Sequence, residues 1–414
     1  MTGAQITILS IYAVIVAIWP IRLLVIEVVL RRQRVLSNNS PRFEQPDPPL
    51  VSAIVPAKDE EVNLPDCLTS VCHLTYPNLE ILVVDDRSTD RTAEIARGFA
   101  ERDPRVRVLS IEHLPPGWTG KTHALDQALG HTRGQWLLFL DADTLHAPES
   151  LSVLMEYGRS EGASLVSLLP ELNCQTFWER VVQPPAAITL MQSFPLHVVN
   201  NDRSSLAFAN GQYILIKRSA YEAAGGHRAV RERFVEDIGI AEKVKSLGLP
   251  IRVALVRGLV SCRMYSSFGQ LVRGWSRILY DALGRKTWRL VLKLLDPIIF
   301  CQSGHVALAA ALILMALGHA GPFAIWLLIL ALVHHGLMFL LFLRVYTFSV
   351  PGSRSTPWFP LANLVVDLIL VRAITMCLTG NVTWRGTAYQ SSGVDGQLDT
   401  RNQELATDRT GGTP

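Results

Sequence analysis

Two aspartates, Asp141 and Asp143, stand directly after an apolar run in the stretch Trp136-Leu-Leu-Phe-Leu-Asp-Ala-Asp-Thr144. Two carboxylates held this close repel each other unless a positive group joins them. Mg²⁺ or Mn²⁺ is such a group, because these hard cations prefer oxygen ligands and complete their shells with water and phosphate oxygens. The pattern therefore predicts a metal and diphosphate site at Asp141 and Asp143, although Asp-x-Asp alone occurs by chance in many chains.

Acidic residues also follow two other apolar runs. Pro56-Ala-Lys-Asp-Glu-Glu61 ends the run that begins at Leu50, and Asp85-Asp-Arg-Ser-Thr-Asp90 follows Leu79–Val84. Ligands of open parallel sheets bind outside the carboxyl ends of the strands. Asp and Ser are also good turn and helix-capping residues, which explains any single acidic end. Three acidic strand ends together favour a functional rim of the sheet.

The segments around these motifs alternate between strand and helix patterns. We expect strands over Leu50–Pro56, Leu79–Val84, Val106–Ser110 and Gln135–Leu140, and helices over Glu61–Leu74, Ser88–Asp103 and Gly120–His131. Such alternation indicates a largely parallel sheet covered by helices on both faces. No glycine-rich phosphate loop of the Walker or dinucleotide type is present. Carboxylates such as Glu60, Asp85 and Asp86 could instead accept hydrogen bonds from a uracil imide or from ribose hydroxyls.

The composition adds a membrane part to this α/β domain. Of the 414 residues, 49% are apolar and only 18% charged, and the apolar excess is concentrated in stretches long enough to cross a bilayer. These stretches are about Ile6–Leu30, Pro297–Leu317, Pro322–Leu343 and Leu361–Leu378. Arg31, Arg32 and Arg34 follow the first, so the positive-inside rule places the next segment in the cytoplasm. The first stretch lacks the basic start of a signal peptide and is longer than its apolar core.

The net charge and the cysteine content bear on the possible partners and on the compartment of the protein. The net charge of +3 comes without a basic block interleaved with aromatic residues, so we expect no nucleic-acid partner. The six cysteines show no zinc-type spacing, which is typical of free thiols in a reducing compartment.

Taken in order, the motifs PAKDEE, VVDDRSTD, WTGK, FLDAD and ED resemble the inverting GT-A glycosyltransferases of family 2, over about Val51 to Tyr280. Within that family, Pro115–Lys121 and the flanking apolar segments resemble enzymes associated with hopene and carotenoid lipids. The resemblance implies a Rossmann-like GT-A domain, a nucleotide-sugar donor that is often UDP-linked, a divalent metal, and inversion at the anomeric carbon.

The resemblance also implies roles for single residues. Pro56, Glu60 and Asp86, with Asp85 beside them, match positions that line the nucleoside pocket. Lys121 matches a basic residue near the donor diphosphate, where a cation offsets developing charge. Asp141 and Asp143 match the metal aspartates, with Asp143 as the direct ligand.

The catalytic base is expected in Phe234-Val-Glu-Asp237. Asp237 matches the family carboxylate that accepts the proton of the acceptor hydroxyl as its oxygen attacks the sugar, and Glu236 is the alternative. An acidic helix N-terminus, which the helix dipole favours, is the structural explanation for the same pair.

Two later segments of the sequence each allow two interpretations. Gln270-Leu-Val-Arg-Gly-Trp275 resembles the Gln-x-x-Arg-Trp signature with one inserted glycine, so Arg273 and Trp275 are candidates for diphosphate and acceptor contacts. The same segment also fits an interfacial helix with basic residues before a membrane span. Trp178–Val199 is too polar and proline-rich to span, and fits either an element in the headgroup region or a buried helix.

These observations predict an inner-membrane, multi-pass enzyme with a cytoplasmic catalytic domain, which transfers a sugar to a hopanoid- or carotenoid-type lipid. A processive polysaccharide synthase and an inactive membrane scaffold are the alternatives. The expected organisation is a membrane helix at residues 1–34, a linker at 35–49, the GT-A domain at 50–292, a membrane bundle at 293–380 and a polar tail at 381–414. Asp367 and Arg372 are costly in lipid unless paired, so the side of the tail stays open.

Overall fold

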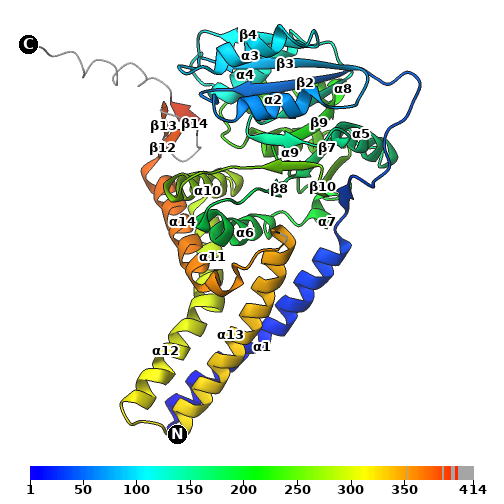
Figure 1. Ribbon diagram of the computed structural model, residues 1–414. Helices are drawn as coiled ribbons and strands as arrows, with labels where there is room; N and C mark the ends of the chain where they lie inside the picture. Colours follow the sequence, from blue (N-terminus) through cyan, green and yellow to red (C-terminus); the bar gives the residue numbers. More distant parts are fainter. Residues whose placement is uncertain (351, 385–386, 393–396, 400–414) are drawn as a thin grey trace, which may run out of the picture. The chain divides into compact units, whose positions relative to one another are not determined.

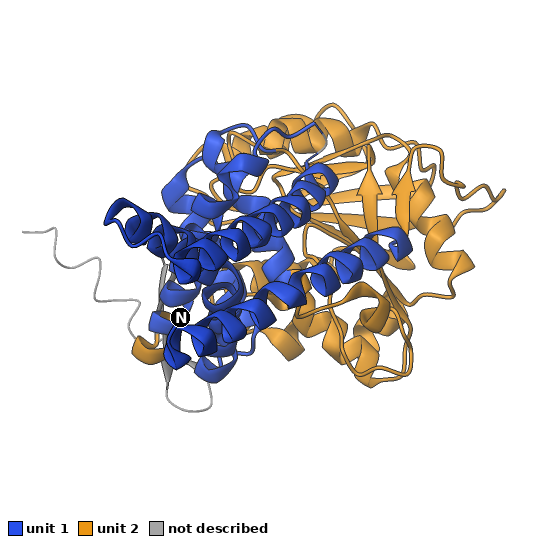
Figure 2. Cartoon of the chain, turned by 90° about the horizontal axis from the view of Figure 1, so that it is seen from below, with its two compact units in different colours: residues 1–33, 174–190, 265–375 blue, residues 34–173, 191–264, 376–414 orange. Residues whose placement is uncertain are grey.

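The computed structural model describes residues 1–350, 352–384, 387–392 and 397–399, and these residues form two compact units. Unit 1 consists of residues 1–33, 174–190 and 265–375, and unit 2 contains residues 34–173, 191–264 and those described after 375 (Figure 2). Unit 2 holds the predicted α/β segments and unit 1 holds the long apolar helices. The chain therefore leaves unit 2 and re-enters it, so neither unit is one continuous segment.

Unit 2 is built on an eight-stranded sheet with the order β1-β10-β7-β9-β5-β2-β3-β4. The strands are β1 (Val35–Ser37), β2 (Val51–Ala57), β3 (Leu79–Asp86), β4 (Val106–Ile111), β5 (Trp136–Leu140), β7 (Leu165–Leu169), β9 (Tyr213–Lys217) and β10 (Ile251–Arg257). All pairs are parallel except those of β9, which is antiparallel to β5 and β7. The predicted mainly parallel sheet is confirmed.

Helices cover this sheet, and its central strands are apolar along their length. The helices of unit 2 are α2 (Leu64–Cys72), α3 (Thr92–Ala100), α4 (Gly120–Leu129), α5 (Ser150–Ser160), α7 (Leu196–Val199), α8 (Arg218–Ala223), α9 (Glu236–Ser246) and the 3-10 helix η1 (His227–Val230). All eight residues of β3 are buried, as expected for a parallel strand covered on both faces. The polar residues at the ends of β2, β3 and β5 therefore come directly after strand residues that are buried in the core.

Two smaller sheets complete unit 2. β6 (Thr144–His146), β11 (Val260–Cys262) and β8 (Glu171–Leu172) form one, and β12 (Asn381–Trp384), β13 (Thr387–Ser392) and β14 (Gln397–Asp399) form the other. The sequence from Gln390 on is polar and low in aromatic residues, which predicts disorder, yet β13 and β14 fall partly within it because backbone pairing needs no apolar pattern. The stretch Thr383-Trp-Arg-Gly386 has the basic and aromatic residues of a juxtamembrane anchor, but its residues 385–386, like the tail from 400 on, lie outside the described residues. The predicted linker at 35–49 begins with β1, whose Leu36 is buried.

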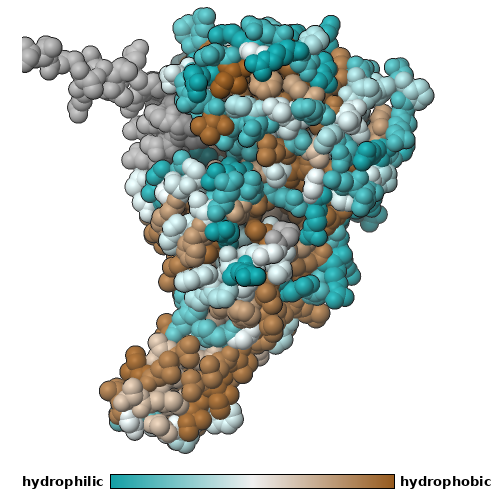
Figure 3. All heavy atoms as spheres, in the orientation of Figure 1, coloured by the Kyte–Doolittle hydropathy of each residue, from teal (hydrophilic) through white to brown (hydrophobic). Residues whose placement is uncertain are grey.

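Unit 1 is helical. It contains α1 (Gly3–Arg32), α6 (Phe177–Met191), α10 (Phe268–Ala282), α11 (Thr287–Pro297), the π-helix η2 (Ile298–Gln302), α12 (Ser303–Ala316), α13 (Pro322–Ser349), the 3-10 helix η3 (Thr356–Trp358) and α14 (Phe359–Thr379). By length and composition, four helical segments could cross a membrane: Gly3–Arg32, Thr287–Ala316, Pro322–Ser349 and Thr356–Thr379. The prediction of one N-terminal and three C-terminal candidate membrane helices is confirmed at the level of length and composition. Apolar residues dominate the surface of α1, α12 and α13 (Figures 1 and 3).

The Trp178–Val199 segment forms α6 and α7. Val181, Val182 and Ala186 of α6 are fully buried, and Tyr346 Oη of α13 donates a 2.6 Å hydrogen bond to the Val181 carbonyl. α6 is therefore buried, but within unit 1 against α13 and not among the helices of the catalytic domain, where the sequence had offered a buried helix as one alternative.

Candidate active site

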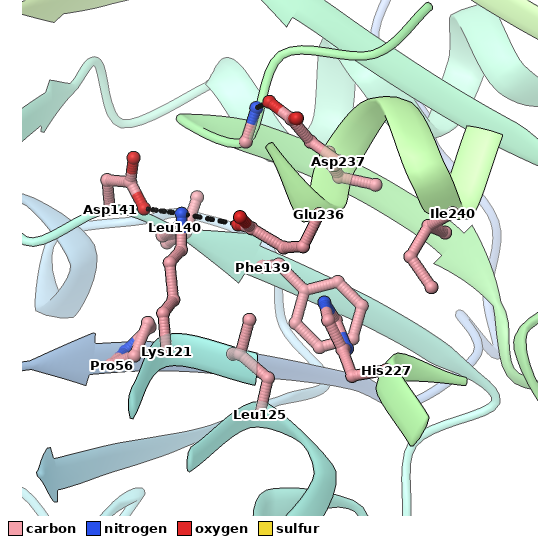
Figure 4. Close-up of a pocket in the computed structure, with 12 residues that line it drawn as sticks. Pro56, Lys121, Leu125, Phe139, Leu140, Asp141, His227, Glu236, Asp237 and Ile240 are labelled. Atoms are coloured by element: carbon pink, nitrogen blue, oxygen red, sulfur yellow. Dashed lines mark hydrogen bonds and ion pairs between the residues drawn. The ribbon is translucent and has the colours of Figure 1, made fainter. Parts of the chain in front are cut away.

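A small pocket, called the cavity below, lies at the carboxyl ends of β2 and β5 in unit 2. Its lining comes from the end of β2, from α4, from the end of β5, from the residues before and within β9, from η1, and from the start of α9. The residues are Pro56, Lys121, Leu125, Phe139, Leu140, Asp141, Gly211, Ile214, His227, Glu236, Asp237 and Ile240 (Figure 4). The fold thus brings together five of the predicted site residues: Pro56, Lys121, Asp141, Glu236 and Asp237.

Lys121 lies at the centre of this cavity, one residue into α4. The helix begins there because Thr119 is extended and its hydroxyl accepts a hydrogen bond from Thr122 N. The Lys121 ammonium is 2.6 Å from Asp141 Oδ1 and 2.7 Å from Glu236 Oε1 (Figure 4). Its side chain is only 19% exposed. Lys121 therefore neutralises Asp141, one of the two crowded aspartates that first indicated a site, and also Glu236.

Burial and charge act in opposite directions on this ammonium. Burial alone lowers the pKa of Lys121, but the carboxylates of Asp141 and Glu236 outweigh it and raise that pKa above its usual value. Lys121 is therefore a permanent cation at neutral pH. Its position next to Asp141 agrees with the predicted neighbourhood of a diphosphate, and its pairing with Glu236 was not predicted.

Asp237 is held by backbone donors at the start of α9. Its Oδ2 accepts a 2.5 Å hydrogen bond from Gly211 N, and its Oδ1 accepts one of 2.7 Å from Ile238 N (Figure 4). Desolvation and the neighbouring Glu236 raise the pKa of Asp237 above its ordinary range, and Lys121 and the two backbone donors only partly counter this. The carboxylate is thus fixed in direction and more basic than an exposed aspartate.

Gly211 allows these side chains to meet. A Cβ atom at this position would lie 3.1 Å from Asp237 Oδ2, 3.2 Å from Lys121 Nζ and 3.4 Å from Glu236 Oε1. Contacts of 3.1–3.2 Å are tighter than ordinary van der Waals packing, so a side chain at this position would force the neighbouring polar groups to shift by a few tenths of an ångström. The sequence had left a close approach and a simple bend open for this glycine.

The residues predicted to line a nucleoside pocket lie at or just after the ends of β2 and β3. Of these four, Pro56, Glu60, Asp85 and Asp86, only Pro56 is among the residues that line the cavity. Asp86 is buried, pairs with the Arg87 guanidinium at 2.8 Å, and its carboxylate lies so close to Gly120 that a Cβ there would collide with it. Asp85 Oδ1 accepts a hydrogen bond from Ser88 N at 3.3 Å, and Glu60 Oε2 accepts one from Asn63 Nδ2 at 2.8 Å. These carboxylates therefore shape the loops after β2 and β3.

The two loops are tied to each other by residues that sequence reasoning missed. Asp59 and Arg87 both have left-handed backbones, with φ of 51° and 56°. Asp59 Oδ1 accepts a 2.8 Å hydrogen bond from Thr89 N, and Glu61 N donates one of 3.0 Å to Asp90 Oδ2. A non-glycine residue with positive φ is uncommon and is retained when the surroundings enforce it. The acidic and Ser/Thr composition of both runs was the available signal.

Asp143 lies just beyond Asp141 and beside the small sheet. It is half-buried, and burial together with the charges of Asp143 and Asp141 raises the pKa of the Cys262 thiol. In the described part of the chain no group of three or more His, Cys, Asp or Glu side chains could hold a metal ion. The donor set is thus limited to these two carboxylates, which suits an ion that takes its remaining ligands from water and phosphate.

His227 is a pocket residue that sequence reasoning did not select. Its Nδ1 is 2.7 Å from Tyr221 Oη, and its ring meets the Phe139 ring edge-on at 5.0 Å. Burial and then the Lys121 charge lower the pKa of His227 to about 3, so the imidazole is neutral and forms part of the cavity wall. Its place directly after Gly225 and Gly226 was the only sequence signal.

Arg273 and Trp275 lie on α10, in unit 1, and are not among the lining residues of the cavity in unit 2. Arg273 is exposed, whereas Trp275 is 4% exposed. Their contacts with diphosphate or acceptor stay a prediction.

Comparison with known proteins defines the class to which this fold and site belong. Residues 52–225 match Glycosyl transferase family 2. A solved structure with a similar fold is the mannosyltransferase PcManGT from Pyrobaculum calidifontis in complex with GDP-Man and Mn²⁺. It has a TM-score of 0.52 and 18% identity, and the match covers 89% of this chain and 98% of that one. Over residues 52–225 the chain therefore matches glycosyltransferase family 2, its α/β unit has the GT-A fold, and the protein is a glycosyltransferase.

Two of the curated relatives that the chain resembles share one name with each other. 4,4'-Diaponeurosporenoate glycosyltransferase from Staphylococcus haemolyticus is 26% identical over 278 residues, which are 64% of this chain and 71% of the relative. The protein of that name from Staphylococcus aureus strain USA300 is 27% identical over 239 residues, 56% of this chain and 62% of the relative. The second match spans less than two thirds of the relative's length.

Proposed function

We propose that the protein is an inverting, metal-dependent glycosyltransferase that moves a sugar from a UDP-sugar to a membrane lipid of carotenoid or hopanoid type. The observation that carries the proposal is the Asp237 carboxylate, oriented by Gly211 N and Ile238 N, in one cavity with Lys121 and Asp141. A general base and a cation beside a metal-type aspartate are the groups that single displacement requires.

Asp237 is the proposed general base. An inverting transfer needs one group that takes the proton of the acceptor hydroxyl while its oxygen attacks carbon one of the sugar. The raised pKa of Asp237 brings its proton affinity nearer to neutral pH, where a base is most effective. Glu236 is less suited to this role, because its Oε1 is engaged by the Lys121 ammonium.

The leaving diphosphate is the proposed partner of Lys121, Asp143 and Asp141. Asp143 and Asp141 would hold a divalent ion, with Asp143 as the direct ligand, and such an ion supplies positive charge that offsets the charge of the departing diphosphate. Mn²⁺ in the PcManGT complex supports a metal of this kind. Lys121 already neutralises Asp141 and adds a second positive charge at the same place. Pro56, Glu60, Asp85 and Asp86 form the nucleoside side of the site.

The acceptor is proposed to be a lipid presented at the bilayer. Four helical segments could span a membrane, and two relatives are named for the carotenoid-type compound 4,4'-diaponeurosporenoate. We infer an inner-membrane location with the predicted catalytic domain, which contains the eight-stranded sheet, on the cytoplasmic side. The basic residues Arg31, Arg32 and Arg34 at the end of α1 support this orientation.

A donor screen with the purified full-length protein in vesicles tests the proposal. UDP- and GDP-sugars are supplied with Mn²⁺ or Mg²⁺ and a polyisoprenoid acid or alcohol, and the product is analysed after lipid extraction. A lipid-extractable product carrying one sugar supports the proposal, and a long polymer would instead indicate a processive synthase. Asp143→Ala is expected to remove the Mn²⁺ dependence of UDP binding, and unchanged dependence would refute the metal site.

A further inference from the structure

Three of the four apolar helices form one bundle. Leu9, Tyr12 and Val16 of α1 pack with Ala307 and Ala311 of α12 and with Leu327 and Ala331 of α13. The N-terminus of α1 and the α12–α13 turn at residues 317–321 share one end of the bundle, called the outer end (Figure 1). Charged residues mark the opposite, inner end, where Arg22 pairs with Asp296 and Glu27 pairs with Arg344.

The side-chain contacts that fix α14 follow one order along the helix. At its start, the Phe359 ring stacks on Phe342 of α13 at 5.2 Å. In its middle, Asp367 Oδ2 accepts a 2.7 Å hydrogen bond from Gln302 Nε2, just before α12 begins. Slightly later, the Ile369 carbonyl accepts a 3.1 Å hydrogen bond from Ser276 Oγ of α10. Along its length α14 therefore moves away from the bundle towards α10 (Figure 1).

A helix that crossed the bilayer with the others would show the opposite order of contacts. Its middle would face the middle of α12 or α13, about 15 Å from either surface of the hydrocarbon core. Asp367 lies halfway along α14, yet its partner Gln302 in η2 is six residues, about 9 Å of helix, from Asp296 at the inner end. The length and hydropathy of α14 alone would indicate a crossing helix, whereas its contacts do not.

α14 and α11 each expose an apolar stripe. Leu364, Leu368 and Val371 are exposed on α14 at positions i, i+4 and i+7, while Val366, Ile369 and Ala373 on the other face are buried. Trp288, Leu292 and Leu295 repeat this spacing on α11. Basic residues accompany the α11 stripe: Arg285, Lys286, Arg289 and Lys293. An apolar face with cationic and aromatic neighbours is typical of a helix that lies in the headgroup region.

We propose that α14 does not cross the bilayer. It lies with α11 at the inner end of the bundle, and both apolar stripes contact the lipid of the leaflet on the catalytic side. The occupant of this surface is lipid because α11 continues through η2 directly into α12, so its stripe joins the lipid-facing surface of the bundle. With three crossing helices, the chain after α14 is on the same side of the bilayer as the end of α1.

Two independent observations agree with this topology. The turn at residues 317–321 contains no Lys or Arg, whereas the segments at the inner end are rich in them, as the positive-inside rule requires. The described residues after Thr375 belong to the compact unit that contains the catalytic sheet. A fourth crossing would separate them from that sheet by the bilayer.

Protease protection of the full chain in sealed vesicles tests the number of crossings. An epitope tag is placed after Pro414 in one version and before Met1 in another. In vesicles whose catalytic unit is digested from outside, we expect the C-terminal tag to be lost and the N-terminal tag to survive. Survival of the C-terminal tag in those vesicles would overturn the proposal.

Lipid photocrosslinking tests the surface itself. A photoreactive amino acid replaces Leu368 of α14, Leu332 of α13, or Leu247 in unit 2, and the protein is illuminated in vesicles of labelled phospholipid. Leu368 and Leu247 are matched, since both are leucines with 49% exposure, and Leu332 is 57% exposed on a crossing helix. We expect lipid adducts at 368 and 332 and at most background at 247. Background labelling at 368 alongside strong labelling at 332 would refute contact of α14 with lipid.

Discussion

Lys121 is the residue on which the charge balance of the pocket depends. It is the counter-charge of both Asp141 and Glu236, and it lies 3.2 Å from the point where a Gly211 side chain would begin. The chain itself therefore supplies a positive charge that offsets the repulsion between the crowded carboxylates, before any metal is bound. A metal and a lysine are two ways to hold the same charges, and the proposed reaction uses both.

Replacing Lys121 by Met is expected to lower thermal stability as well as activity. The buried Glu236 and the half-buried Asp141 lose their partner, and an unsatisfied buried group costs roughly 1–3 kcal/mol. Adding Glu236→Gln removes one of these charges, so the double variant should recover part of the loss. Thermal unfolding of the four proteins of this cycle measures the coupling. Strictly additive effects would show that Lys121 and Glu236 do not interact.

Asp237→Asn is expected to reduce turnover by roughly 100- to 10,000-fold, the range for loss of a general base. Donor binding should stay nearly unchanged, because the amide keeps the volume of the carboxylate. Glu242→Gln is the matched control, since Glu242 is a half-exposed carboxylate on the same helix α9. Wild-type turnover in the Asp237 variant would show that another residue is the base.

The pH dependence of the reaction follows from the raised pKa of Asp237. A base works only when deprotonated, so the rate should fall as the pH drops through this pKa. The fall should occur above the pH at which an ordinary aspartate, of pKa about 3.9, titrates. Glu236→Gln removes the charge that helps to raise the pKa, and should shift the acid limb of kcat/KM to lower pH. An acid limb that does not move would exclude this coupling.

The first residues of two helices place charged side chains in the pocket. α4 begins at Gly120 and presents Lys121, and α9 begins at Glu236 and presents Asp237. The positive end of each helix dipole favours the carboxylates gathered there, which are Asp86 near α4 and Asp237 on α9. The alternative explanation of the Glu-Asp pair, an acidic helix start, is thus correct and compatible with its proposed catalytic role.

Gly120→Ala tests the approach of α4 to the end of β3. The new methyl group would collide with the Asp86 carboxylate, which must move if the helix stays in place. Overpacking of this kind costs about 1–3 kcal/mol, so UDP-sugar affinity is expected to fall about tenfold or more. Gly98→Ala on α3 is the control, because its Cβ would meet only Arg102 Nη2 at 3.8 Å. Equal donor affinities in titration calorimetry would remove Asp86 from the donor site.

At the scale of the whole molecule, the membrane helices imply a reaction that takes place at a surface. If the acceptor is a lipid of the same bilayer, the rate should follow its mole fraction in the vesicle and not its bulk concentration. Diluting the acceptor with inert phospholipid at constant total acceptor should lower the initial rate in proportion. A rate that depends only on bulk concentration would indicate a water-soluble acceptor and contradict the lipid proposal.

Much of the fold could be predicted from local patterns. The strands β2, β3, β4 and β5 and the helices α2, α3 and α4 lie where apolar periodicity placed them, with ends that differ by a few residues. The antiparallel strand β9 was not predicted, because its apolar residues were interpreted only as part of the acceptor segment. The positions of Asp59, Arg87 and His227 were missed, since each depends on a loop or helix brought in from another part of the chain.

The sequence by itself determined the class of fold, the membrane helices by length, and the residues available for chemistry, because these depend on composition and short-range spacing. Only the tertiary structure decided that Lys121 pairs with Asp141 and Glu236, since that contact joins three elements through the strand order of the sheet. It also decided the direction of α14. Hydropathy records how apolar a helix is, whereas the course of the helix depends on the partners that its polar groups find, here Gln302 and Ser276.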